Sequence, residues 1–167
     1  EGYYCPLGTE VPIECYLGTY CPLGTDFPIP CPLGYRAAEP TANDTIALFG
    51  DLNTACLPCE PGWYGDDPKR MECYFGLDGY YYVGGTNQAQ PSNLTSHNGA
   101  ECPVGHYCPA GSSVPIACQA GTYNPYLRMY NESHCLPCGT DRYQQSDGQP
   151  TCFQCSSSSY AIGSQNL

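Results

Sequence analysis

Basic residues are scarce in this sequence: five of its 167 residues are lysine or arginine, sixteen are acidic, and the formal net charge is −11. So few cations cannot neutralise a row of phosphates, which excludes nucleic acid as an expected partner. Methionine occurs only twice, and long aliphatic runs and helical periodicity are missing, so no large single core is expected. No apolar run reaches eighteen residues and no signal peptide is present, so no membrane segment is expected in this chain.

The motifs of common catalytic sites are also missing. There is no G-x-S-x-G, no H-E-x-x-H and no phosphate-binding glycine loop, so we predict no enzymatic activity, no catalytic residue and no cofactor. Asp66 and Asp67 are the one adjacent acidic pair, and we interpret them as a solvated turn because no array of carboxylates that could bind calcium accompanies them. His97, His106 and His134 are scattered along the chain, which favours surface or packing roles.

Cysteine, glycine, proline and tyrosine are abundant instead. The chain has 14 cysteines, 19 glycines, 17 prolines and 16 tyrosines. Cysteine at this density predicts a scaffold of disulfides that replaces a hydrophobic core. Such bonds require an oxidising compartment, so a secreted protein, extracellular or at the cell surface, is expected.

One motif, C-x-x-G, recurs along the chain. Residues 101–118 (ECPVGHYCPAGSSVPIAC) contain it twice, residues 14–31 (ECYLGTYCPLGTDFPIPC) are a near-copy, and residues 2–15 are a partial copy. Proline presets φ and glycine permits a left-handed backbone, so each step predicts a tight turn beside a crosslink. A tyrosine often follows four or five residues later and is expected to cover a disulfide. The motif begins at Cys5, Cys15, Cys21, Cys31, Cys59, Cys73, Cys102, Cys108 and Cys118.

The cysteine spacing shows an internal duplication. Intervals of 6, 10, 3 and 14 residues occur in the same order twice, and only the middle loop differs, with 25 positions in one copy and 17 in the other. Residues 1–76 therefore form a first cysteine-rich block, which opens with a partial copy at 1–14, and residues 101–155 form a second. Between them, residues 77–100 are predicted to be a tyrosine-rich strand and a polar linker. Residues 156–167 are a serine-rich tail.

Three N-glycosylation sequons support a secretory route. They begin at Asn43, Asn93 and Asn131, and two of them lie in the matching middle loops of the two copies. Because a chain with such sequons and many cysteines matches an extracellular glycoprotein, we expect N-linked glycans on these three asparagines.

The pattern C-x-x-G-x-Y followed by C-x-x-C, at residues 118–138 and 31–59, resembles the cysteine-rich repeats of ephrin-receptor-like and tumour-necrosis-factor-receptor-like proteins. The resemblance covers about residues 2–155 and lies in the spacing of cysteine, glycine and tyrosine. It implies that the cysteine before G-x-Y bonds the next cysteine downstream. The implied disulfides are Cys15–Cys21, Cys31–Cys56, Cys59–Cys73, Cys102–Cys108, Cys118–Cys135 and Cys138–Cys152.

We therefore expect a small disulfide-rich fold of tandem cysteine-rich modules, with short β-strands and turns and little helix, stacked into an elongated rod. Cys5 and Cys155 are left over by the implied pairing. They could pair with each other, with cysteines outside these residues, or with another copy of the chain. Pairing with each other is awkward in a rod, so our hypothesis is that they belong to incomplete repeats and join neighbouring units.

Zinc binding and thiol–disulfide exchange are the alternative roles for the cysteines. Cys135, Cys138, Cys152 and Cys155 have the spacing of a four-thiolate zinc ribbon. In the first copy, however, Gly76 stands where the fourth ligand would be, and the sequons favour disulfides, so no metal site is predicted. The C-x-x-C steps belong to the tiled repeat, which favours structural crosslinks over a redox enzyme.

Two functions fit this pattern. The first is a structural extracellular glycoprotein, a subunit of a fibre or surface coat that assembles through contacts with its own kind, for which the mastigoneme-like fibres of algae and protists are an analogy. The alternative is the ligand-binding or stalk segment of a cell-surface receptor. Repeats that run nearly from end to end, without a distinct recognition domain, favour the structural function.

Overall fold

The computed structural model describes residues 1–39, 49–68 and 71–155. In this part of the chain the β structure consists of eight antiparallel two-stranded hairpins, which turns and single-turn helices connect. Six disulfides crosslink them. The structure is thus the small, disulfide-rich β fold with little helix that the sequence predicts.

All the regular elements are short. The hairpins pair β1 (Tyr3–Tyr4) with β2 (Ile13–Glu14), β3 (Thr19–Tyr20) with β4 (Ile29–Pro30), β5 (Tyr35–Ala37) with β6 (Cys56–Pro58), β7 (Trp63–Tyr64) with β8 (Tyr74–Phe75), β9 (Tyr80–Tyr82) with β10 (Gly99–Glu101), β11 (His106–Tyr107) with β12 (Ile116–Ala117), β13 (Thr122–Tyr123) with β14 (Leu136–Pro137), and β15 (Arg142–Tyr143) with β16 (Phe153–Gln154). The helical turns are α1 (Leu52–Ala55), α2 (Leu94–His97) and η2 (Glu132–His134). None of the helices in the described residues has the length and apolarity needed to cross a membrane.

Every hairpin begins and ends with the same backbone arrangement. The residue before its first strand has a left-handed backbone, which explains why glycine occupies this turn position in seven hairpins, with Asp141 in the eighth. The carbonyl of this turn residue accepts a hydrogen bond of 2.8–2.9 Å from the N–H of the residue that follows the second strand. This bond defines eight units: residues 2–15, 18–31, 34–59, 62–76, 79–102, 105–118, 121–138 and 141–155.

Successive units are spaced by a fixed rule. The residue that closes one unit lies three positions before the turn residue of the next, so it also opens the next unit. This shared residue is a cysteine at every boundary except one, where Gly76 takes its place. Residues 77–100, for which the sequence predicts a strand and a linker, supply most of unit 5, in which β9 and β10 pair over three residues.

The buried interior consists of cystines and tyrosines. In the first units Cys15, Cys21, Cys31 and Cys56 are buried together with Phe49 and Ala55, and the rings of Tyr4, Tyr20 and Tyr35 pack against them. A second cluster contains Tyr64, Tyr80 and Tyr82. Because each hairpin is too thin to enclose a core, crosslinks and flat rings provide the burial that long aliphatic side chains provide in larger domains.

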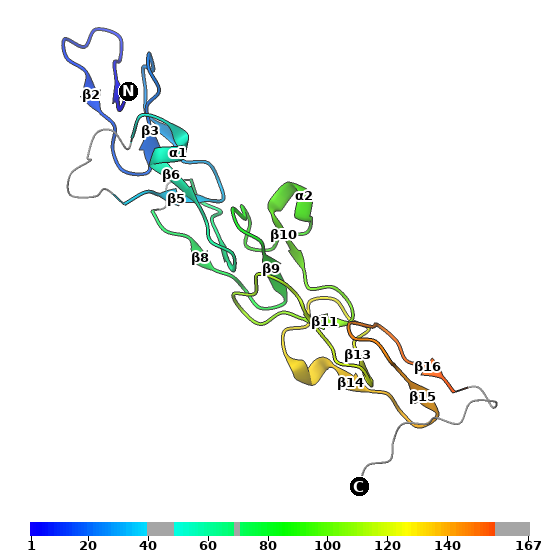
Figure 1. Ribbon diagram of the computed structural model, residues 1–167. Helices are drawn as coiled ribbons and strands as arrows, with labels where there is room; N and C mark the ends of the chain where they lie inside the picture. Colours follow the sequence, from blue (N-terminus) through cyan, green and yellow to red (C-terminus); the bar gives the residue numbers. More distant parts are fainter. Residues whose placement is uncertain (40–48, 69–70, 156–167) are drawn as a thin grey trace.

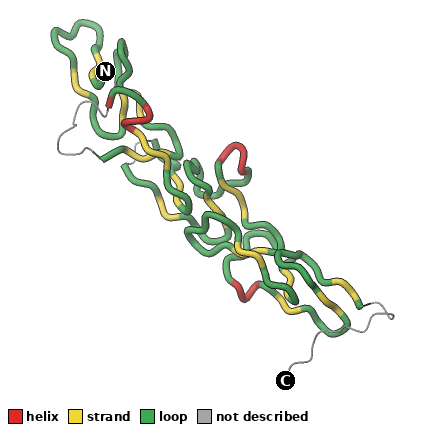
Figure 2. Tube along the Cα trace, viewed as in Figure 1, coloured by secondary structure: helices red, strands yellow, loops and turns green. Residues whose placement is uncertain are grey.

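The units follow one another in sequence order across the view in Figure 1, with β1 and β2 near one end and β15 and β16 near the other. Figure 2 shows that turns and loops make up most of the trace between the short strands. Stacking of this kind places each unit against its sequence neighbours. An elongated rod remains a prediction that this order supports.

Candidate functional site

The junctions between successive units repeat one backbone hydrogen bond. At six junctions the N–H of the turn residue in one unit donates to a carbonyl in the next unit, with N···O distances of 2.7–3.1 Å. The accepting residue always lies three positions after the turn residue of its own unit, and we call it the junction residue. The pairs are Gly2–Cys21, Gly34–Gly65, Gly62–Tyr82, Gly79–Cys108, Gly105–Asn124 and Gly121–Gln144.

Junction residues are buried in units 2 to 8. In unit 1, by contrast, the junction residue Cys5 is exposed. The hydrogen bonds at the junction use only backbone groups, so side chains at this position are free to vary as long as they fill the space. The junction residues of units 1 to 8 are, in order, Cys5, Cys21, Ala37, Gly65, Tyr82, Cys108, Asn124 and Gln144.

A second set of contacts joins units that are two apart. A Cβ added to Gly34, Gly62 or Gly105 would overlap the carbonyl of Gly85, Gly111 or Gly148, respectively, which lies near the hairpin tip two units further on. The tip glycine also donates its N–H to the opening residue of the preceding unit, as Gly111 does to the Gly76 carbonyl at 2.9 Å. Backbones can approach this closely only where no side chain intervenes, which explains glycine on both sides.

The six disulfides are of two kinds, and they pair the same cysteines that the resemblance implies. Cys15–Cys21 and Cys102–Cys108 join the opening residue of a unit to its junction residue, with Cα atoms 6.2 and 5.8 Å apart. The other four join the opening residue to a residue in or beside the second strand, with Cα separations of 5.5–5.9 Å. They are Cys31–Cys56, Cys59–Cys73, Cys118–Cys135 and Cys138–Cys152.

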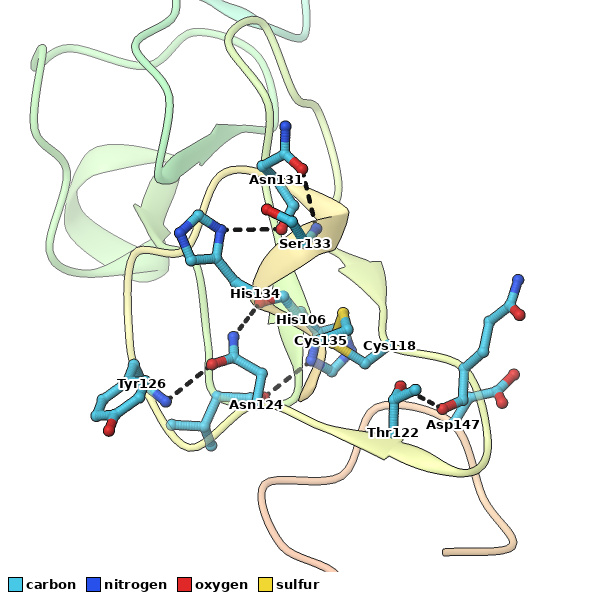
Figure 3. Close-up of a disulfide and its surroundings, with 12 residues drawn as sticks. His106, Cys118, Thr122, Asn124, Tyr126, Asn131, Ser133, His134, Cys135 and Asp147 are labelled. Atoms are coloured by element: carbon cyan, nitrogen blue, oxygen red, sulfur yellow. Dashed lines mark hydrogen bonds between the residues drawn. A yellow bond between two sulfur atoms is a disulfide. The ribbon is translucent and has the colours of Figure 1, made fainter. Parts of the chain in front are cut away.

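In units 5, 7 and 8, which have no disulfide between the opening and junction residues, an aromatic or polar side chain occupies the junction. Asn124 is fully buried; its Nδ2 donates to the His106 carbonyl at 2.7 Å and its Oδ1 accepts from the Tyr126 N–H at 3.0 Å. Figure 3 shows this pair of bonds beside the Cys118–Cys135 disulfide. Gln144 plays the same part in unit 8, with its Nε2 2.8 Å from the Thr151 carbonyl. Neither residue was predicted from the sequence, although both align with Cys21 and Cys108.

Unit 5 fills its junction with Tyr82. The ring is fully buried and stacks on Tyr64 with centroids 5.7 Å apart. Its hydroxyl accepts from the Leu77 N–H at 3.0 Å and donates to the Ala89 carbonyl at 2.8 Å. Burial, reinforced by the neighbouring charges of Tyr64, Tyr80 and Asp78, raises the pKa of Tyr82 to about 12.

The two cysteines outside these bonds lie in the outermost units. Cys5 is exposed and Cys155 is half-buried, and neither forms a disulfide within the described residues. Cys155 closes unit 8, because its N–H donates to the Asp141 carbonyl at 2.8 Å. Figure 1 places their units at opposite ends of the view, so the two thiols of one chain do not meet.

Two of the predicted glycosylation sites are exposed and share one local geometry. Asn93 and Asn131 precede the helical turns α2 and η2, and each Oδ1 accepts a hydrogen bond from the N–H two residues on, at 2.8 Å from Thr95 and 2.9 Å from Ser133. This cap occupies the amide oxygen, while Figure 3 shows Nδ2 of Asn131 directed away from the chain. The third predicted site, Asn43, lies outside the described residues.

The residues considered as metal ligands are not brought together. Cys135 and Cys138 belong to two different disulfides, and the described residues contain no cluster of three or more potential ligands. Asp66 and Asp67 are exposed. The histidines lie in three different units: His97 ends α2, whereas the Nδ1 atoms of His106 and His134 are each 3.0 Å from a nearby backbone carbonyl.

One open hollow of about 280 Å³ lies between units 3 and 4. It is lined by Trp63, one guanidinium and three carboxylates, and its cysteine, Cys73, is in a disulfide. The remaining lining residues are Arg36, Glu39, Glu60 and Glu72.

Neither the models of known protein families nor the curated proteins contain a match to this chain. The resemblance to extracellular cysteine-rich repeats therefore stays a prediction from residue spacing.

Proposed function

We propose that this chain is a structural extracellular glycoprotein, a subunit of a fibre or surface coat that assembles through contacts with its own kind. The observation that carries the proposal is the junction hydrogen bond, which recurs with the same donor and acceptor positions at six places. A junction made from backbone groups accepts any unit of the same kind. Stacks of this type extend by adding further units, and they do not require a recognition domain.

The disulfides, the glycosylation sequons and the net charge support an extracellular location. Disulfides crosslink six of the eight units, a density that persists in oxidising compartments. Glycans on Asn93 and Asn131 would project from helical turns at the sides of the stack, away from the junctions. A net charge of −11 keeps such a polymer soluble and makes it a poor ligand for nucleic acid.

Electron microscopy of the oxidised protein tests this function. We expect filaments or sheets in which the chain repeats along an axis, and a rod in micrographs of single molecules. Monodisperse particles that stay separate at high concentration would overturn the proposal. If such a monomer also bound a separate protein through one face, the receptor-stalk alternative would explain the chain better.

A further inference from the structure

The disulfides divide the chain into closed loops and open stretches. Tension on the oxidised chain passes from one cysteine to its partner through the sulfur–sulfur bond, so the residues inside a disulfide loop carry none of it and cannot extend. Only the stretches between one disulfide and the next can lengthen. Between Cys15 and Cys152 these stretches are residues 21–31, 56–59, 73–102, 108–118 and 135–138.

One of these stretches is much longer than the others. From Cys73 to Cys102 the chain advances 29 positions, whereas none of the other four stretches exceeds ten. The long stretch contains the whole of unit 5, whose strands β9 and β10 pair over three residues. At about 3.5 Å per residue it can reach roughly 100 Å when extended, against roughly 35 Å for a stretch of ten.

Unit 5 is open because other residues stand where its neighbours have cysteines. In units 3, 4, 7 and 8 the residue that opens the unit bonds to the residue three positions before the closing residue, as Cys59 does to Cys73. In unit 5 these two positions are Gly76 and Gly99, and Tyr82 takes the position of the second cysteine in the short disulfides. Of units 2 to 8, as far as the structure describes them, unit 5 is therefore the one that no disulfide closes.

We propose that unit 5 is the extensible element of this chain: tension opens it in one step, and the stretch from Cys73 to Cys102 lengthens the chain while every disulfide stays intact. The inference goes beyond the proposed fibre function and does not depend on it, because it concerns the response of a single chain. In a fibre, the same element would lengthen a loaded subunit before a covalent bond breaks.

The hairpin of unit 5 is pulled apart from its open end. Tension enters the unit at its turn residue Gly79 and leaves at its closing residue Cys102, and a hydrogen bond of 2.9 Å joins these two residues. Once this bond breaks, the load passes to the pair Tyr80 and Glu101 and then to the two pairs beyond it. Bonds that are loaded one after another break at a lower force than bonds that share the load, so the geometry favours opening.

Contacts with both neighbouring units keep unit 5 closed at rest, and Tyr82 takes part in several of them. Its carbonyl accepts from the Gly62 N–H of unit 4 at 2.8 Å, and its N–H donates to the Ser112 carbonyl of unit 6 at 2.9 Å. Its ring stacks on Tyr64, and its hydroxyl makes two hydrogen bonds within the long stretch. Because these contacts share one residue, they are lost together, which makes the opening a single event.

Opening changes no covalent bond, so it is reversible. The strands of unit 5 pair with each other, so its contacts are local in the sequence, and no disulfide has to be re-formed when the load falls. The disulfides of units 4 and 6 hold those units folded on either side. We therefore expect unit 5 to close again against them.

Single-molecule force spectroscopy of the oxidised protein tests the proposal. Handles are attached through azide-bearing residues substituted at Leu23 and Val114, two exposed positions in units 2 and 6, so that units 3 to 5 lie between the handles. Besides residues 73–102, the open stretches between these handles are 23–31, 56–59 and 108–114. We expect one step that is longer than roughly 30 Å and reaches up to roughly 100 Å, with a reverse step on relaxation.

A crosslink within the hairpin should remove the long step. Tyr81 and Ala100 lie directly opposite each other on β9 and β10, and opposed residues of antiparallel strands have Cα atoms about 4.5–5.5 Å apart, which a disulfide can span. In Tyr81→Cys/Ala100→Cys only residues 73–81 and 100–102 stay open, so the largest step should shrink about threefold. Tyr81→Ser/Ala100→Ser is the control: it loses the same two side chains without a crosslink and should keep the long step.

Two results would overturn the proposal. The first is a parent chain that shows no step longer than roughly 30 Å while its disulfides are intact. The second is a long step that survives in the crosslinked variant after mass spectrometry has shown the new disulfide. Loss of the long step in the serine control would also count against the role of the crosslink. If the new disulfide does not form, the step of the parent chain still decides the question, and neither readout depends on filament formation.

Discussion

The ring of Tyr82 lies where a side chain on Gly76 would have to be: a Cβ at Gly76 would overlap the Cδ2 and Cε2 atoms of the tyrosine. These two residues occupy the opening and junction positions of unit 5, the positions that the short disulfides Cys15–Cys21 and Cys102–Cys108 occupy in units 2 and 6. A buried aromatic ring beside a glycine has thus replaced a crosslink. The ring compensates with two hydrogen bonds through its hydroxyl.

Substitution of Gly76 by alanine should destabilise the fold. The added methyl would meet both the Tyr82 ring and the Gly62 carbonyl, which lies 2.6 Å from the Cβ position, so the ring or the backbone must shift. Overpacking of this kind costs about 1–3 kcal/mol. Denaturation midpoints in urea measure the loss. Gly139→Ala is the matched control, because a Cβ there meets no atom of the described residues within 4 Å, and equal midpoints for the two variants would contradict the packing argument.

The double variant Gly76→Cys/Tyr82→Cys should form a seventh disulfide within the chain. The two positions correspond to a spacing of six residues that is bridged twice elsewhere, at Cα separations of 6.2 and 5.8 Å. A count of free thiols in the denatured, unreduced protein checks this. We expect the same count as in the parent chain, whereas two additional free thiols would show that unit 5 differs in backbone geometry from units 2 and 6.

Tyr82 should ionise later than the other tyrosines. Burial raises its pKa from 10.0 to about 12, so the folded state keeps this proton to a higher pH than the unfolded state does. The stability linked to this proton is complete below pH 10 and declines as the pH rises towards 12. Absorbance of tyrosinate during a rapid alkaline titration should show a late component that Tyr82→Phe removes. If the variant keeps that component, another tyrosine produces it.

Cysteine spacing predicted the fold class because cysteine marks most unit boundaries. Cysteine spacing did not predict the hairpin of unit 5, because Gly76 and Tyr82 occupy the opening and junction positions that are cysteines in units 2 and 6. A repeat that is recognised from cysteine alone is missed where residues of other types fill the same space. The junction residues Asn124 and Gln144 were not predicted for the same reason. They are recognisable only once the turn glycine, rather than the cysteine, is taken as the origin of each unit.

The backbone geometry of the glycosylation sites could not be predicted from the sequence either. The sequons locate Asn93 and Asn131, but α2 and η2 are single turns of four and three residues, too short for any periodicity to appear in the sequence. The caps become visible only in the structure, because they depend on the extended backbone of the asparagine and the turn that follows it.

This geometry allows the glycan at Asn93 to be separated from the helix cap. Thr95→Ala removes the sequon but keeps the backbone N–H that bonds to Asn93 Oδ1, so it should abolish glycosylation with little loss of stability. Asn93→Gln removes both and should cost about 1 kcal/mol more. Mass spectrometry of the secreted protein before and after treatment with an N-glycosidase measures occupancy. An unchanged glycan mass in Thr95→Ala would show that the sugar is attached elsewhere.

Contacts between units two apart should account for part of the free energy of unfolding. Two glycines with nearly equal backbone conformations allow this part to be measured separately. Gly62 and Gly8 have φ of +88° and +87°, so alanine is strained to the same degree at both, by about 1–2 kcal/mol. At Gly62 the methyl would also overlap the Gly111 carbonyl, whereas at Gly8 it meets no atom within 4 Å in the part of the chain that the structure describes.

Gly62→Ala should therefore unfold at a lower urea concentration than Gly8→Ala, when both are measured in a Cys5→Ser/Cys155→Ser background that cannot form disulfides between chains. Overlap with a backbone carbonyl cannot be relieved by a change of rotamer, so unit 4 and unit 6 must separate, and we expect a further loss of about 1–3 kcal/mol. Hydrogen exchange should place the added opening at the amides of Gly111 and Gly62, because both N–H groups bond across units. Equal midpoints and equal exchange would mean that each hairpin is stable without its second neighbour, and the units would then be independent modules.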